Sequence, residues 1–165
     1  DEIYCGVRIP DVEYLGISTR ASWVSVSDYG ELGKIVDHAH DHGVETVVTT
    51  DLPFMAKIIE KQIKKHVFSC AEEGIDALIA SDVGILLMMK KMGLDVPVYA
   101  STYLGSMNYE AVDFLRKLGA RRVILERHTT INEIRRIVQK CRDMETEIFV
   151  HGAGCSNITL TATAV

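Results

Sequence analysis

The feature that most constrains the fold is a repeat in which a short apolar run is followed by a longer amphipathic stretch. The runs are rich in β-branched and aromatic residues, and several are apolar almost throughout. Strands of a parallel sheet that is covered on both faces have this composition. We therefore predict six strands, at residues 2–7, 45–50, 76–81, 96–101, 122–125 and 147–151.

The stretches between these runs carry apolar residues at helical spacing, which predicts helices. The predicted helices span residues 30–42, 54–73, 84–92, 108–118 and 131–143. A glycine follows four of them, as is typical of a helix carboxyl end: Gly43, Gly74, Gly93 and Gly119. A regular alternation of strand and helix with short returns predicts right-handed crossovers and a parallel sheet.

Two α/β architectures fit this alternation, an open doubly wound sheet and a closed TIM-type barrel. No glycine-rich phosphate loop follows the first strand, which weighs against a dinucleotide-binding fold and favours the barrel. Because a full barrel takes about 200–250 residues, we expect one incomplete TIM-barrel-like domain over residues 1–165, of about six βα units and truncated at both ends. Open sheet edges in such a barrel predict pairing with another chain, as a homo- or hetero-oligomer.

Composition and charge limit the classes of partner. The net charge of −5 argues against a strongly basic nucleic-acid binder but leaves room for a local basic patch. A helix face with Lys57, Lys61, Lys64 and Lys65 is either a solvated surface or such a patch. No apolar run approaches the roughly 18 residues of a membrane span. Four cysteines without a CxxC pair predict reduced thiols and a cytoplasmic location.

Three histidines close the first predicted helix, at His38, His40 and His42. His40 follows Leu32 and Val36 on the stripe that we expect to face inward. We therefore predict a solvated pair, His38 and His42, and one inner, hydrogen-bonded His40, in preference to a metal site.

Polar residues follow every predicted strand, where TIM-type barrels carry their active sites. Ser, Thr and Asp at such positions also suit the caps of the next helices, so both interpretations remain open for several of them. Arg127, His151 and Cys155 are poor caps, and we predict that they are catalytic. The predicted substrate-binding residues are Arg20, Asp51, Asp82, Ser101, Thr102 and His128.

Several segments in this order resemble one family. Residues 74–84, GIDALIASDVG, are similar to the family's GVDALIVQDLG; residues 118–127, LGARRVILER, to LGAKRVVLSR; and residues 149–155, FVHGAGC, to FVHGALC. Weaker likenesses lie at residues 2–6, 39–43 and 100–102. Together they resemble the U32 collagenase-like peptidases, whose amino-terminal domain is TIM-barrel-like.

This resemblance implies two activities. Members are classed as peptidases, whereas others hydroxylate RNA bases or quinone precursors without oxygen, using an iron–sulfur cluster held by cysteines. The position of Cys155 matches the first cluster cysteine, but Ala162 stands where the second is expected. A cubane cluster normally takes four thiolates, so residues outside this chain would have to complete it. His128 also departs from the family, which usually has Glu there.

Three functions follow from these observations. The first is a peptidase in which Cys155 attacks and His151 accepts a proton. The second is a hydroxylase in which Arg20 and Arg127 hold an anionic cosubstrate or phosphate. The third is a non-catalytic barrel that binds a partner or ligand. The substrate is accordingly a peptide, a small molecule or an RNA, and our leading expectation is the peptidase.

Overall fold

The computed structural model describes residues 1–9, 25–50, 52 and 56–151. Six strands form one sheet in the order β1-β2-β3-β4-β5-β6, and each strand pairs in parallel with the next. They are β1 (Glu2–Gly6), β2 (Glu45–Thr49), β3 (Ala77–Ala80), β4 (Val98–Ala100), β5 (Arg122–Ile124) and β6 (Glu145–Glu147). The predicted α/β class of parallel βα units is confirmed.

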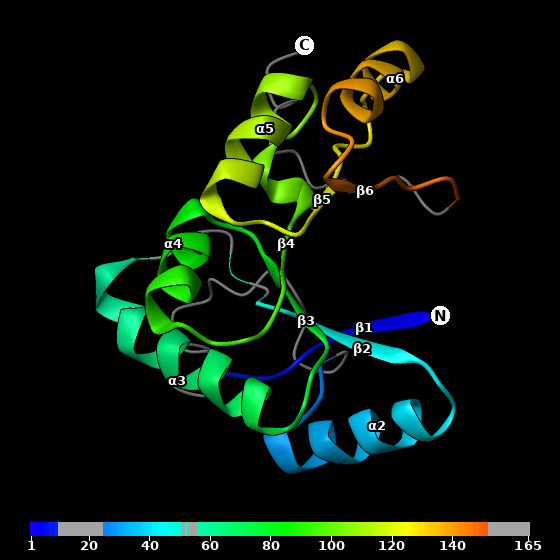
Figure 1. Ribbon diagram of the computed structural model, residues 1–165. Coiled ribbons are helices and arrows are strands. Elements are labelled where there is room, and N and C mark those ends of the chain that lie inside the picture. Colours follow the sequence, from blue (N-terminus) through cyan, green and yellow to red (C-terminus); the bar gives the residue numbers. More distant parts are fainter. Residues whose placement is uncertain (10–24, 51, 53–55, 152–165) are drawn as a thin grey trace, which may run out of the picture.

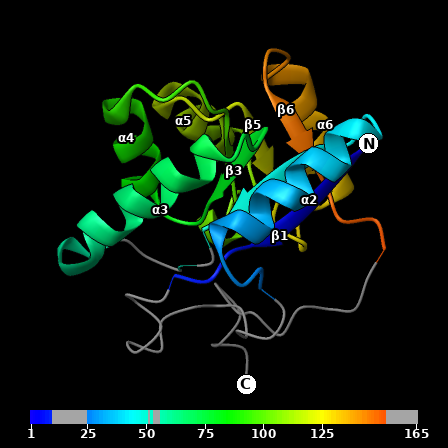
Figure 2. The same cartoon turned by 90° about the horizontal axis from the view of Figure 1, so that it is seen from below.

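The helices cover the convex side of a curled sheet, which gives the fold the shape of a half-barrel (Figure 1; Figure 2). The α-helices are α2 (Tyr29–Asp41), α3 (Glu60–Glu72), α4 (Val83–Met92), α5 (Tyr109–Leu118) and α6 (Ile131–Lys140). Two short 3₁₀ turns, η2 (Lys57–Ile59) and η3 (Thr102–Leu104), precede α3 and α5. All five predicted helices are therefore present.

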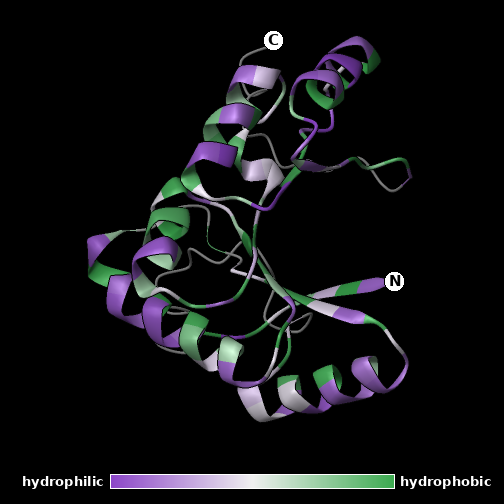
Figure 3. Ribbon diagram, in the orientation of Figure 1, coloured by the Kyte–Doolittle hydropathy of each residue, from purple (hydrophilic) through white to green (hydrophobic). Residues whose placement is uncertain are grey.

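Two local features place the helices: a stripe of apolar residues that packs on the sheet, and a capping side chain at the amino end. The helices carry both hydrophobic and hydrophilic residues (Figure 3), and each buries apolar residues. The buried faces of Val36, Ile63, Ile85 and other helical residues pack against Val48 and Leu78 of the sheet. Side chains cap four helix amino ends: Asp28, Asp82, Asn108 and Thr130 each accept a hydrogen bond from a backbone N–H of the first turn.

The last strand lies two residues earlier than the sequence predicts. We expected residues 147–151, but β6 is Glu145–Glu147, which matches the three residues of β5 one for one. The last hydrogen bond between the two segments runs from Leu125 N–H to the Glu147 carbonyl. Beyond it the chain that follows β5 turns away, so residues 148–150 have no neighbouring strand with which to pair. Their apolar side chains are consequently exposed, Val150 by 87%.

Arg122 crosses the concave side of the sheet. Its Nη1 lies 2.8 Å from Oε2 of Glu2 on β1, which is 120 residues away in sequence. The same guanidinium donates to Glu145 and Glu147 of β6, each at 3.2 Å. Its Cζ also lies 4.1 Å from the ring centroid of Tyr99 on β4. One cation thus joins the first, fourth and last strands near their amino ends.

The charges around Arg122 hold it ionised. Burial by itself lowers the pKa of the guanidinium, but the hydrogen bond and charge of Glu2 and the hydrogen bond of Glu145 outweigh it, and the net pKa is raised. The Arg122 side chain is 20% exposed and its carboxylate partners somewhat more. Removal of the cation would leave three carboxylates facing one another in a half-buried space.

We predict that Arg122→Ala lowers the free energy of unfolding by about 2 to 3 kcal/mol, less than for a fully buried pair because the carboxylates are partly exposed. Chemical denaturation at neutral pH measures this. Arg121→Ala is the matched control, because Arg121 pairs with Glu145 at 2.9 Å but is 64% exposed. The control should cost under about 1 kcal/mol. Equal costs for the two variants would contradict a special role for Arg122.

A second buried polar group is a histidine on the inner face of α3. His66 is 1% exposed, its Nδ1 is 3.1 Å from the Tyr29 hydroxyl, and the Cys70 sulfur is 3.8 Å from both ring nitrogens. Burial lowers the pKa of His66 to about 4, so the folded protein keeps this imidazole neutral at neutral pH. The unfolded chain binds a proton at this residue at a higher pH than the folded chain does.

This difference makes the fold sensitive to acid. Because the folded pKa is depressed, the stability that His66 contributes is complete above its unfolded pKa of about 6.5 and is lost as the pH falls toward about 4. We predict a loss of about 3 kcal/mol over that interval. In His66→Gln this part of the pH profile should flatten, whereas in His38→Gln, which removes an exposed imidazole, it should persist. Denaturation at a series of pH values measures both.

Candidate functional site

The carboxyl ends of the strands form one rim of the half-barrel. At β2 and β3 the rim is built by two buried hydroxyls, Thr50 and Ser81, whose oxygens lie 3.1 Å apart. Ser81 also donates to the Leu52 carbonyl, and Thr50 donates to the Ile79 carbonyl at 3.3 Å. These hydroxyls hold the strand ends together, and both of their hydrogens are given to backbone carbonyls. Neither can donate to a ligand as well, so the interpretation of these two residues as structural suits them better.

Three predicted substrate-binding residues lie on the same rim. Asp82 caps α4, with its Oδ1 2.5 Å from Gly84 N–H. Ser101 caps η3 by accepting from Tyr103 N–H at 3.3 Å. Thr102, half-buried, begins that turn. Asp82 and Ser101 therefore act as helix caps, which was one of the two interpretations that the sequence left open. A substrate contact at either residue remains a prediction.

Arg127 lies in the turn that follows β5 and is exposed. Its Cζ stands 4.1 Å from the ring centroid of Phe149, in the segment after β6, so the two loops meet at the rim. Among the described residues Arg127 forms no ion pair. The stacked guanidinium thus presents its N–H donors to whatever enters the rim.

Beside Arg127, His128 contacts a carboxylate. Its Nδ1 lies 2.8 Å from Oε1 of Glu126, whose side chain is only 13% exposed, while the imidazole is 67% exposed. The backbone N–H of Glu126 donates to the Ser106 carbonyl, which fixes this residue against the loop after β4. A carboxylate is therefore present at the rim two residues before the position where the family usually has Glu.

Of the three predicted catalytic residues, the structure describes Arg127 and His151. His151 is exposed two residues beyond Phe149, so it follows the ring on which Arg127 stacks. Cys155 lies outside the described residues, as do the predicted substrate-binding residues Arg20 and Asp51. A shared centre of Arg127, His151 and Cys155 therefore remains a prediction.

Sequence reasoning missed two members of the rim, Glu126 and Phe149. A signal for Glu126 was present: Arg122 and Ile124 alternate on β5, and Glu126 continues the same alternation two residues beyond the last residue of the strand. Phe149 carried no such signal, because its position depends on the end of β6, which the apolar run placed too late.

Two of the three cysteines that the structure describes, Cys70 and Cys141, do not suit the ligation of an iron–sulfur cluster. Cys70 is fully buried in α3, and burial raises the pKa of its thiol to about 12. Cys141 is also buried, and burial raises its pKa as well. Cluster ligation needs accessible thiolates that converge on one point, and within the described ranges no group of three or more metal-ligating side chains converges.

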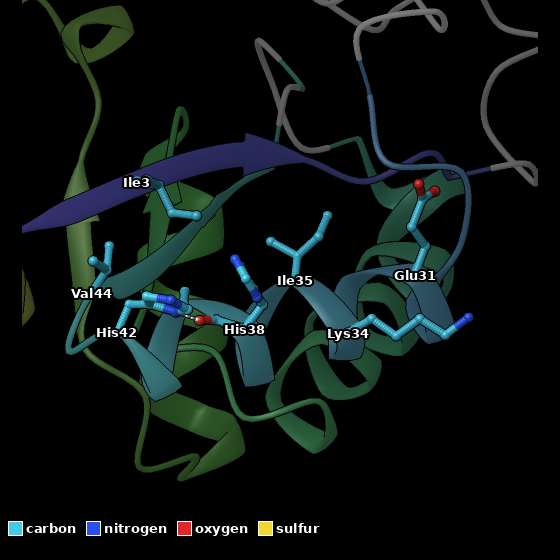
Figure 4. Close-up of a pocket in the computed structure, with 8 residues that line it drawn as sticks. Ile3, Glu31, Lys34, Ile35, His38, His42 and Val44 are labelled. Carbon is cyan, nitrogen blue, oxygen red and sulfur yellow. Dashed lines mark hydrogen bonds between the residues drawn. The ribbon is translucent and has the colours of Figure 1, made fainter.

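A hollow of about 540 Å³ lies away from the rim, between α2 and the edge of the sheet (Figure 4). Ile3 and Ile35 line it together with His38 and His42, whose ring centroids are 4.5 Å apart. We expected His40 to face inward, and this prediction was wrong. His40 is exposed, because Ala39 takes the buried position after Val36. The exposed His40 ring instead lies 2.9 Å from Asp76, and this hydrogen bond raises the pKa of the imidazole.

Comparison with known proteins identifies the family. The model of peptidase family U32 matches residues 1–159. The chain belongs to peptidase family U32. A solved U32 peptidase structure matches with a TM-score of 0.67 and 16% identity, covering 90% of this chain and 60% of that one. At that identity the match supports the fold alone, and it agrees with the parallel βα architecture.

Curated relatives differ in their described activities. The tRNA hydroxylation protein P of Escherichia coli is 35% identical over 121 residues, which are 73% of this chain and 26% of that protein. The 23S rRNA 5-hydroxycytidine synthase of Escherichia coli is 30% identical over 76% of this chain and 18% of its own length. An uncharacterized protease of Methanocaldococcus jannaschii is 30% identical over 96% of this chain and 37% of its own length. The chain thus spans about a quarter of the first relative.

In the part of the chain that the structure describes, no helix is long and apolar enough to cross a membrane.

Proposed function

We propose that this U32 domain belongs to an enzyme that hydroxylates a base of tRNA or ribosomal RNA. The observation that carries the proposal is its 35% identity, over most of the chain, to a tRNA hydroxylation protein. An rRNA 5-hydroxycytidine synthase adds support from a second RNA substrate. An RNA substrate also agrees with the cytoplasmic location that the reduced cysteines predict.

The chemistry limits what the chain must supply. Hydroxylation replaces a C–H bond of the base by C–OH, so the base loses two electrons and gains one oxygen atom. We propose that both requirements are met by an anionic cosubstrate that accepts the electrons and delivers the oxygen. A carboxylate or phosphate group on that molecule suits Arg127, whose planar guanidinium is stacked on Phe149 and binds oxyanions through two N–H groups.

The peptidase interpretation, our leading expectation from the sequence, has less support. The uncharacterized protease of Methanocaldococcus jannaschii favours it by name. A cysteine peptidase needs its nucleophile within hydrogen-bond reach of a base. His151 is exposed, and Cys155 lies outside the described residues, so no such pair supports this mechanism. Cleavage of a peptide by the purified full-length protein, without any RNA modification, would favour the peptidase over our proposal.

Deletion of the gene tests the proposed activity. We predict that tRNA or ribosomal RNA from the deletion strain lacks one hydroxylated nucleoside that the parent strain contains, and that the gene on a plasmid restores it. Mass spectrometry of digested RNA detects the change as one oxygen atom. Identical nucleosides in the deletion and parent strains would contradict the proposal.

Arg127→Ala tests the proposed anion contact. Because hydrogen bonds to charged groups are worth about 1.5 to 3 kcal/mol, kcat/KM for hydroxylation should fall about 10- to 100-fold. The exposed position predicts a free energy of unfolding within about 0.5 kcal/mol of wild type. RNA nucleoside analysis and thermal unfolding of the same variant measure the two effects.

Arg142→Ala is the matched control, because Arg142 is exposed in the loop before β6, at the opposite end of the strands. It should keep full activity. If Arg127→Ala unfolds, its role is structural. If it remains folded and fully active, the anion contact is wrong while RNA hydroxylation by the wild type stands.

A further inference from the structure

The outer surface of η2 and α3 carries an unusual concentration of positive charge. Four lysines on it are exposed: Lys57, Lys61, Lys64 and Lys65. We call this surface the lysine face. Its charges differ from the chain as a whole, whose net charge is −5. A local cationic surface on an acidic chain gives a polyanion one preferred place to bind.

Most of the charge on the lysine face is uncompensated. Glu60 neutralises Lys64, whose Nζ lies 2.5 Å from its Oε1. Lys57, Lys61 and Lys65 form no ion pair with any residue that the structure describes. Lys61 and Lys65 are one helical turn apart and project on the same side of α3, because residues four apart in a helix share a face. A fold-stabilising role would have used i,i+4 carboxylate partners, as at Glu60.

Apolar side chains interrupt the lysines on this surface. Ile58 is 76% exposed and Phe68 is 48% exposed, although the opposite side of α3 buries Ile63, Val67 and Cys70. Phe68 follows Lys61 by seven residues and therefore lies on the same face. Cations that alternate with an exposed aromatic ring suit a nucleic acid strand, since lysines bind phosphates and a ring stacks on bases.

The lysine face begins near the candidate site. η2 follows the loop after β2, whose end Thr50 forms part of the rim. From Lys57 to Lys65 the helical rise is about 12 Å, a length that spans several phosphates of one strand. An RNA strand that places one base at the rim thus meets these lysines where it continues along the outside of the half-barrel.

We infer that the lysine face binds the phosphate backbone of the substrate RNA next to the target base. This rests on the proposed function for the identity of the polyanion. The lysines contact RNA in the ground state and in the transition state alike, so their loss raises KM and leaves kcat unchanged. They contribute affinity and do not take part in the chemistry.

The test is the double variant Lys61→Gln/Lys65→Gln of the full-length protein, with fluorescently labelled total tRNA from the deletion strain as the probe. Fluorescence anisotropy over a series of salt concentrations gives Kd and its salt dependence. For single-stranded contacts the slope of log K against log salt should shrink by about 0.7 for each lysine that is removed. KM for hydroxylation should rise in parallel with Kd.

The matched control is Lys117→Gln/Lys140→Gln, which removes the same charge from the exposed surfaces of α5 and α6. It should leave Kd, the slope and KM unchanged, and circular dichroism should show both double variants folded. Equal losses in the two variants, or an unchanged slope in the Lys61/Lys65 variant, would overturn the lysine face while hydroxylation by wild type still stands. Wild-type protein that neither binds nor modifies tRNA or ribosomal RNA would overturn both proposals.

Discussion

The half-barrel depends on one cation held between strands that are far apart in the sheet. Backbone ladders join each strand only to its neighbours, so they leave the curvature of the sheet free to vary. Arg122 fixes that curvature, because its contacts with Glu2 and Glu145 reach from β5 to both sheet edges. These contacts lie near the amino ends of the strands. Stability is thereby concentrated at one end of the fold, and the opposite rim is left to the loops.

That division explains the character of the rim. Backbone groups and helix ends use the hydroxyls of Thr50 and Ser101. Glu126, the nearest acidic group along the chain from Arg127, contacts His128. Arg127 therefore stacks on the ring of Phe149 and forms no ion pair within the described part of the chain. A guanidinium that is oriented but not neutralised is a suitable donor for an oxyanion.

Local patterns predicted most of the fold, because periodicity and helix caps depend on neighbouring residues. The glycines after helices and the parallel order of the strands both follow from them. Long-range contacts were beyond reach: Arg121 and Arg122 look alike in sequence, and only the register with β6 shows which faces inward. For the site, sequence motifs identified the family, but the peptidases and the hydroxylases of that family share those motifs. The choice between them depends on relatives and on groups outside the described residues.

The parallel connectivity also has an electrostatic consequence. Every helix from α2 to α6 follows a strand, so all five begin at the carboxyl rim. Each aligned row of peptide dipoles contributes roughly half a positive charge at its amino end. The molecule is therefore polarised along the strand direction, with its attractive end at the rim. An approaching polyanion would be turned toward that end before any side chain touches it, and no single substitution can reverse this orientation, because chain connectivity sets it.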